Sequence, residues 1–301
     1  MEAADINDEE GAIAFVLERT DARNGDDAAV LRAGTSATCV SVDSTIEGVH
    51  VPRGCPPLLH GRRAVARALS DLAAMGAAPL AVTCAVHVPA ERWPDAAEAM
   101  EGAIERAGAQ GAPVVGGDFS SVHARELALV VTVIGVRASS RAGFVTRAGG
   151  CPGDLLVVTG SLGAALLAPP GAAPPEPPDR LRAGRALAPH VRSMVDVSDG
   201  LVRDVRHLAR GAGCTAHVEL LDVPLADPSL DPRDAAAVGD DYELLAAIAP
   251  DRLEPARAAL VAADLAVPLT IVGRLADGHA GELSLLRAGK RIEAPSGFLH
   301  T

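Results

Sequence analysis

Strand-like and helix-like segments alternate through the first half of this 301-residue chain, and this alternation limits the folds that it can adopt. Apolar residues recur with period two over residues 38–43, which is typical of a half-buried strand. An alanine-rich helix is expected over residues 60–77, closed by Gly76. The remaining expected elements are helices at 13–20 and 95–110 and strands at 80–88, 112–118 and 126–136. This order indicates an α/β protein.

The stretch GGCPGD, residues 149–154, consists of turn-forming residues, and a new strand begins directly after it. Since 301 residues are enough for two cores, we predict one domain over residues 1–148 and a second over residues 149–301. Within the second domain, residues 169–178 include six prolines and should form a stiff, exposed loop. Residues 211–216, GAGCTA, follow a helix and should cap it rather than bind a dinucleotide.

Composition and charge exclude several classes of protein. Hydrophobic residues make up 49% and aromatic residues only 2%, so the core must consist of Ala, Val and Leu. The net charge of -12 argues against nucleic acid or an anionic membrane as a partner, because both require a basic surface. The only lysine, Lys290, lies in neither a Walker loop nor a protein-kinase strand motif.

Cysteine usage and hydropathy indicate a compartment. The five cysteines include no C-x-x-C pair and are typical of reduced core residues. The acidic N-terminal stretch does not resemble a signal peptide, and the longest apolar run, residues 127–136, is too short to span a bilayer. We therefore predict a soluble, cytoplasmic protein.

Two carboxylates, Asp196 and Asp199, lie in MVDVSDGLVRD, where a short buried strand leads into a helix expected over residues 201–210. One explanation is helix capping, in which Ser198 or Asp199 accepts from free backbone N–H groups of the first turn. Capping does not explain Asp196, which shares a strand face with Ser198. Converging acidic side chains cost free energy unless a cation lies among them, so a metal site is the second explanation.

Acidic residues next to glycine, serine or a strand end recur in five separate stretches. Each could be a solvated turn or helix residue, but Asp71 lies among apolar helix neighbours and is hard to explain in that way. On the strand before it, Asp43 should share a face with Ser41, while Val40 and Val42 should face the core. The acidic residues are Asp26, Asp27, Asp43, Glu47, Asp71, Asp118, Asp196 and Asp199. Such hard oxygen ligands favour Mg²⁺ over Zn²⁺, and Mg²⁺ would let an acidic protein bind a polyphosphate.

Seven motifs follow one another along the chain: GDDAAVL, DSTIEGVH, LSDLAAMGA, VVGGD, TRAGGCPGD, VDVSDGL and DDYEL. In this order and spacing they resemble the thiamine-monophosphate kinase family, and the resemblance covers about residues 11–300. The family belongs to a superfamily with aminoimidazole ribonucleotide synthase and selenophosphate synthetase. The resemblance implies a homodimer of two-domain α/β chains, in which N-terminal strands of both subunits form a barrel and the C-terminal domain is an α/β sandwich. It also implies transfer of the γ-phosphoryl group of ATP to thiamine monophosphate.

The resemblance further implies roles for individual residues. Those implied to hold several Mg²⁺ ions are Asp26, Ser41, Val42 through its carbonyl, Asp43, Asp71, Asp118, Asp196 and Asp199. Those implied to contact ATP are Gly117, Asp118, Arg147 and Ser198, and those implied to contact thiamine monophosphate are His50, Asp240 and Phe298. Arg147, Asp118 and Asp199 would act in catalysis. Two departures concern Val42, where the family commonly has Thr, and Asp240, where it has Glu.

The expected reaction is direct in-line transfer without a phospho-enzyme, because the acceptor phosphate is largely a dianion at neutral pH and needs no general base. Two alternatives stay open. One is another ATP-dependent reaction of the superfamily, although this chain lacks the reactive cysteine and lysine that its selenophosphate and hydrogenase-maturation members need. The other is a degenerate nucleotide-binding protein, which the residues at 42 and 240 would suggest.

Overall fold

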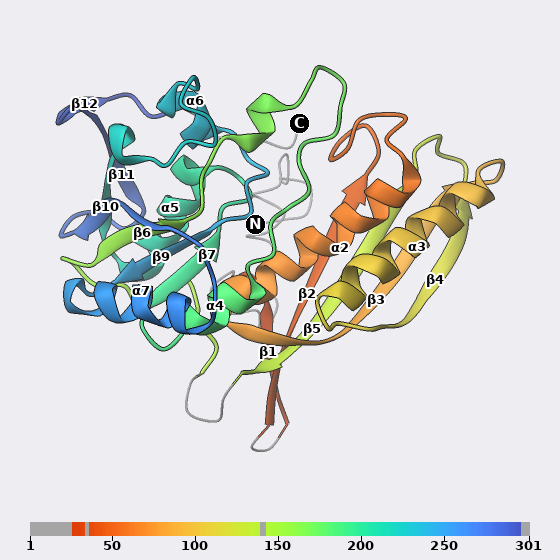
Figure 1. Ribbon diagram of the computed structural model, residues 1–301, viewed down its shortest axis with the longest axis horizontal. Helices are drawn as coiled ribbons and strands as arrows, with labels where there is room; N and C mark the ends of the chain where they lie inside the picture. Colours follow the sequence, from red (N-terminus) through yellow and green to blue (C-terminus); the bar gives the residue numbers. More distant parts are fainter. Residues whose placement is uncertain (1–25, 34–35, 139–142, 296–301) are drawn as a thin grey trace, which may run out of the picture.

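The computed structural model describes residues 26–33, 36–138 and 143–295, which form two β-sheets with helices packed on them (Figure 1). The first sheet has the strand order β1-β2-β5-β3-β4. Its strands are β1 (Ala29–Ala33), β2 (Ser36–Ile46), β3 (Ala77–Pro89), β4 (Val114–Val122) and β5 (Ala128–Arg137). Helix α3 (Trp93–Ala109) connects the parallel pair β3 and β4, as a crossover requires. The expected alternation of strands and helices is confirmed. The helix expected at 13–20 lies outside the described residues.

Helix α2 (Pro57–Ala74) lies beside α3 on one face of the first sheet. The two backbones touch: a methyl group on Gly61 would lie 1.7 Å from the Ala99 carbonyl oxygen. A methyl group on Gly102 would likewise lie 2.0 Å from the carbonyl oxygen of Leu58. Only glycine permits such an approach, so α2 is held rigidly against α3.

The buried face of β2 is not the one that the sequence predicted. Cys39, Ser41 and Thr45 are buried beneath the helix layer, whereas Val42 is 60% exposed. The prediction that Val40 and Val42 face the core was therefore wrong. Both faces of this strand carry apolar residues, and the helices cover the face that holds the hydroxyl groups. No described element covers the other face, where Leu31 is also 56% exposed.

The second sheet has the strand order β12-β11-β8-β10-β6-β9-β7. Its strands are β6 (Leu155–Thr159), β7 (Ser193–Asp196), β8 (Thr215–Glu219), β9 (Leu244–Ile248), β10 (Leu269–Ala276), β11 (Glu282–Arg287) and β12 (Lys290–Ile292). Its helices are α4 (Leu181–Leu187), α5 (Leu201–Ala212), α6 (Pro232–Ala237) and α7 (Leu253–Ala262). Gly213 ends α5 in the left-handed conformation, φ 66°, which confirms the expected helix cap.

A continuous apolar core joins the two sheets. Leu69 and Leu72 of α2 belong to the same buried cluster as Leu187 of α4, Met194 of β7 and Leu260 of α7. A second cluster lies between α5 and the opposite face of the second sheet. Helix α2 therefore fixes the position of the first domain relative to the second.

The proline-rich segment 169–178 is exposed over residues 169–172 and mostly covered after them, although Pro175 is exposed. In its second part, the Pro174 carbonyl accepts from Arg63 at 2.7 Å, and Glu176 pairs with Arg62 at 2.9 Å. Arg106 of α3 also donates to the Pro177 carbonyl at 3.0 Å. The expectation of an exposed loop was thus half correct, because arginines of the first domain hold its second part. In the described part of the chain, no helix is long and apolar enough to cross a membrane.

Candidate active site

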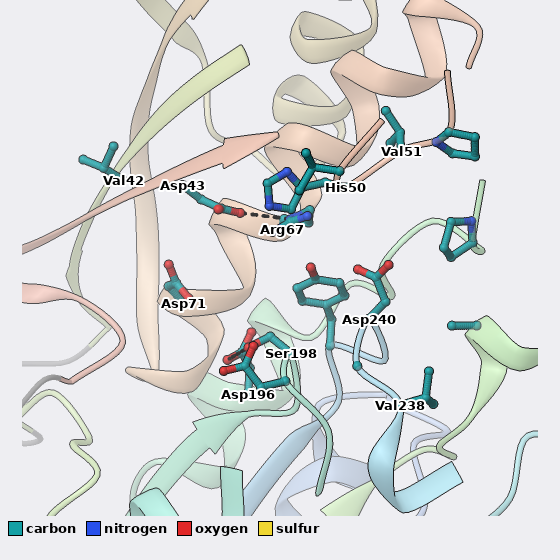
Figure 2. Close-up of a pocket in the computed structure, with 17 residues that line it drawn as sticks. Val42, Asp43, His50, Val51, Arg67, Asp71, Asp196, Ser198, Val238 and Asp240 are labelled. Atoms are coloured by element: carbon teal, nitrogen blue, oxygen red, sulfur yellow. Dashed lines mark hydrogen bonds and ion pairs between the residues drawn. The ribbon is translucent and has the colours of Figure 1, made fainter. Parts of the chain in front are cut away.

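A pocket of about 420 Å³ opens between the two sheets (Figure 2). It is bounded by β2 and α2 on one side and by the loops that follow β7 and α6 on the other. The residues that line it are Val42, Asp43, Val49, His50, Val51, Pro52, Arg67, Asp71, Ala165, Pro174, Asp196, Ser198, Asp199, Val238, Gly239, Asp240 and Tyr242. Eight of the residues implied by sequence motifs, at positions 42, 43, 50, 71, 196, 198, 199 and 240, therefore meet in one cavity.

The turn after β7 shows why two carboxylates stand there. The N-cap of α5 is Gly200, at φ 95°, and no side chain in the described part of the chain caps this helix. The capping explanation for Ser198 and Asp199 was therefore wrong. Asp196 is 2% exposed and accepts from Ser70 at 2.6 Å, and Ser198 donates to it at 3.5 Å. Both carboxylates are left to face the pocket.

Three aspartates from separate elements form the centre of the site. Asp27, Asp71 and Asp196 each contribute one carboxylate oxygen, and these oxygens lie within 4.8 Å of one another. Ser41 donates to Asp71, while Asp27 Oδ2 is buried without a hydrogen-bond partner among the described residues. An orphaned carboxylate oxygen beside two other carboxylates fits a hard cation such as Mg²⁺.

The pKa values of these groups reflect their crowding. Burial and the neighbouring charges of Asp196 and Asp27 hold the pKa of Asp71 well above its ordinary value. Burial and the charge of Asp27 raise the pKa of Asp196 to about 7. Three ionised carboxylates at this separation would repel one another strongly without a cation.

The metal-free protein should lose stability as the pH rises from about 4 through about 7. A carboxyl group with a folded-state pKa above its unfolded value of 3.8 binds its proton more tightly when folded, so its contribution falls as the pH rises from 3.8 through about 7. Melting temperatures in a chelator across this range measure the effect, and Mg²⁺ should restore much of the loss at the upper end. A Mg²⁺-independent melting temperature at about pH 8 would contradict a cation site at Asp27, Asp71 and Asp196.

Arg147 lies behind the three aspartates rather than in the pocket wall. Its guanidinium donates to Asp27 Oδ1 at 2.7 Å, and its backbone N–H donates to Asp26 Oδ1 at 2.9 Å. Asp26 and Arg147 therefore adjoin the acidic centre, although neither lines the cavity. From this position Arg147 offsets negative charge and holds Asp26 and Asp27 in place.

The other end of the pocket is formed by His50 and Asp240. The His50 ring accepts from the Ile46 backbone N–H at 3.0 Å. Asp240 has φ 72°, an unusual conformation for a residue with a side chain, and donates its N–H to the Ser198 carbonyl at 2.9 Å. Its carboxylate pairs with buried Arg63 at 3.2 Å. The strained loop is thus tied both to the turn after β7 and to α2.

Two predicted site residues lie far from this pocket within the chain. Gly117 and Asp118 are on β4, and β5 and β3 stand between β4 and the β2 strand that carries Asp43. Three strand spacings amount to about 14 Å. Strand register also places Asp118 with Ala85, on the opposite face from buried Cys84. A third predicted residue, Phe298, lies outside the described residues.

Sequence patterns gave no individual role to two residues that the structure brings to the site, Arg67 and Tyr242. Arg67 pairs with Asp43 at 3.1 Å, and the Arg67 guanidinium lies 5.9 Å from the Tyr242 ring centre. Asp27, which the sequence placed among the clustered acidic residues, completes the acidic centre. One signal for Arg67 was present, because it precedes Asp71 by four residues on a helix and so shares its face.

Comparison with known proteins defines the class to which this fold and site belong. Residues 25–137 match the family model of the AIR synthase related protein N-terminal domain, and residues 151–285 match that of the C-terminal domain. The chain is 37% identical to a thiamine-monophosphate kinase of Halobacterium salinarum, covering 85% of this chain and 90% of the relative. It is 30% identical to that of Escherichia coli, covering 89% and 88%. The chain belongs to the thiamine-monophosphate kinase family.

Solved structures agree with this assignment of the fold. A thiamine-monophosphate kinase from Stenotrophomonas maltophilia has a TM-score of 0.73 at 29% identity, covering 94% of this chain and 96% of the other. A structure of AaThiL complexed with AMPPCP and TMP has a TM-score of 0.82 at 24% identity, covering 100% and 99%. The expected two-domain architecture is confirmed.

Proposed function

We propose that this protein transfers the γ-phosphoryl group of ATP to thiamine monophosphate and so produces thiamine diphosphate. The observation that carries the proposal is the pocket itself, in which the acidic centre at Asp71 and Asp196 opens toward His50 and Asp240. Its relatives named thiamine-monophosphate kinase and the complex of AaThiL with AMPPCP and TMP support this choice of substrates.

The acidic centre would hold Mg²⁺, which supplies charge neutralisation for phosphate oxygens when it is bound. We assign the metal-binding role to Asp27 in addition to the motif residues Asp26, Ser41, Val42, Asp43, Asp71, Asp118, Asp196 and Asp199. For Val42 only the carbonyl is a candidate, because its side chain is 60% exposed on the uncovered face of the sheet. Ser198, Gly117 and Arg147 are proposed to act on ATP.

The chain's own residues would align two anions rather than form a covalent intermediate. The acceptor phosphate, with a second pKa of about 6, is largely a dianion at neutral pH and can attack without a general base. His50, Asp240 and Phe298 are proposed to orient thiamine monophosphate so that its phosphate faces the acidic centre. In-line transfer then depends on alignment and charge stabilisation.

We further propose that the active form is a homodimer. The uncovered face of the first sheet exposes apolar Leu31 and Val42, and a second copy would bury them. A second copy would also account for Asp118, which cannot reach Asp71 within one chain. A cytoplasmic location stays a prediction from the five free cysteines.

The test is release of ADP from Mg²⁺-ATP with thiamine monophosphate as the acceptor. Unphosphorylated thiamine and the aminoimidazole-pathway substrates serve as competing acceptors in the same assay. We expect ADP release with thiamine monophosphate as the acceptor and with none of the other acceptors. Turnover with another acceptor would favour a different reaction of the superfamily, and nucleotide binding without turnover would favour a degenerate protein.

A further inference from the structure

We propose that Arg67 binds the phosphate of the acceptor and bridges it to the phosphoryl group that is being transferred. The inference rests on the proposed function and adds to it a residue that determines phosphate recognition. None of the sequence motifs assigns Arg67 a role.

The position of Arg67 links the two ends of the pocket. It projects from α2, and its Nε donates to Asp43 Oδ2 at 3.1 Å. Figure 2 shows its guanidinium between Asp43 and Asp240, beside His50. The acidic centre would bind the ATP phosphates, and His50 with Asp240 would bind the thiamine moiety. The acceptor phosphate must lie between these two ends, which is where Arg67 stands.

Charge makes a cation necessary at this point. Among the described residues that line the pocket, Arg67 is the single arginine or lysine, whereas five aspartates line it. Mg²⁺ would neutralise the aspartates that hold it, but Asp240 is not among them, so an incoming phosphate monoester would still meet a carboxylate and a second anion. The Arg67 side chain is 10% exposed, and a guanidinium shielded from water in this way stabilises phosphate oxygens better than one in water would.

The donor geometry of Arg67 leaves room for a ligand. A guanidinium has five N–H donors, and the contact with Asp43 uses the one on Nε. Among the described residues, its terminal amino groups make no further hydrogen bond, and its guanidinium carbon lies 5.9 Å from the Tyr242 ring centre. The donors on these amino groups are therefore available to a phosphate, which an arginine can bind through two parallel N–H groups.

The neighbouring arginines are already engaged. Arg63 is completely buried, donates to the Pro174 carbonyl and pairs with Asp240. Arg147 pairs with Asp27 behind the acidic centre. Of the described arginines, Arg67 is the one that lines the pocket and can reach an acceptor phosphate.

The competing explanation is purely structural: Arg67 would hold Asp43 and Tyr242 in place. The two explanations differ in phosphate discrimination, the ratio of affinities for thiamine monophosphate and unphosphorylated thiamine. Removal of a residue that contacts the phosphate changes this ratio. Removal of a residue that only supports the pocket weakens the binding of both ligands by the same factor and leaves the ratio unchanged.

The experiment compares the wild-type protein with Arg67→Ala and Arg67→Lys. Calorimetric titrations with thiamine monophosphate and with thiamine, in Mg²⁺ and AMPPCP, give the two dissociation constants, and steady-state assays give kcat and the KM for ATP. We expect Arg67→Ala to raise the dissociation constant of thiamine monophosphate by about 10- to 100-fold and that of thiamine by less than about 2-fold. Lys should retain part of the affinity, and added guanidinium should partly restore kcat of the Ala variant.

The matched control is Arg291→Ala, which removes an exposed arginine paired with Glu282 at 3.1 Å, on β12 of the second sheet. It should leave every constant unchanged. If Arg67→Ala leaves the ratio of the two affinities unchanged, the inference about Arg67 is overturned, whereas the proposed function is not affected. A wild-type protein that binds and phosphorylates no thiamine monophosphate would overturn the proposed function, and the role of Arg67 with it.

Discussion

Asp71→Asn should reduce turnover by roughly a thousandfold or more at saturating Mg²⁺-ATP and thiamine monophosphate. Asp71 lies at the centre of the acidic cluster, where its carboxylate oxygen is within 4.8 Å of those of Asp27 and Asp196. An amide keeps the shape of the side chain and can still accept from Ser41, but it cannot supply the negative charge that a divalent cation requires. ADP release under single-turnover conditions measures the loss in the chemical step.

The same substitution should have the opposite effect on stability in the absence of metal. At about pH 8, the metal-free variant should melt about 2–4 °C above the wild type, because one of three repelling carboxylates is gone. Added Mg²⁺ should raise its melting temperature less than that of the wild type.

The control for this experiment is Asp251→Asn, which alters an exposed aspartate on η4 (Pro250–Arg252). This variant should keep both the turnover and the melting temperature of the wild type. A metal-free Asp71→Asn protein that melts well below the wild type would mean that Asp71 supports the fold. Near-normal turnover would remove it from the metal site.

Local patterns in the sequence were sufficient to predict most elements of the first sheet and its helices, and the acidic residues that meet in the site. Strand and helix periodicities located β2, β3, α2 and α3, because each element buries one face against a neighbour with a fixed spacing. The acidic side chain at Asp71, among apolar neighbours, indicated a partly buried charge, and Asp196 on a buried strand indicated a buried one. A buried carboxylate is costly enough that its position in the sequence carries information.

The pairing order of strands was not predictable in this way. Strand β5 inserts between β2 and β3, so β4 is displaced to the far edge and carries Asp118 away from Asp43. Nothing local in VVGGD reports this, because pairing depends on distant partners. The face of β2 was misassigned for a related reason: Val42 obeys the alternation rule, but which face the helices cover is a property of the whole domain.

The displaced position of Asp118 leads to the second prediction. If Asp118 acts in the site, it must come from the partner chain of a homodimer, because β4 lies about 14 Å from β2. Each active site would then combine Asp71 of one subunit with Asp118 of the other. Asp118→Asn should by itself abolish turnover, as Asp71→Asn does, while leaving the fold intact, since Asp118 is exposed and bonds to Ser120 at 2.6 Å.

Co-expression of the two inactive variants should then restore activity. Random pairing gives half heterodimers, and in each of these one site receives both wild-type aspartates and the other receives neither. The expected specific activity is therefore about a quarter of the wild-type value. Differently tagged chains allow the heterodimer to be isolated, and its activity should reach about half that of the wild type. If Asp71 and Asp118 of the same chain formed one site, no pairing could produce an intact site, so an inactive, correctly assembled heterodimer would rule out the shared arrangement.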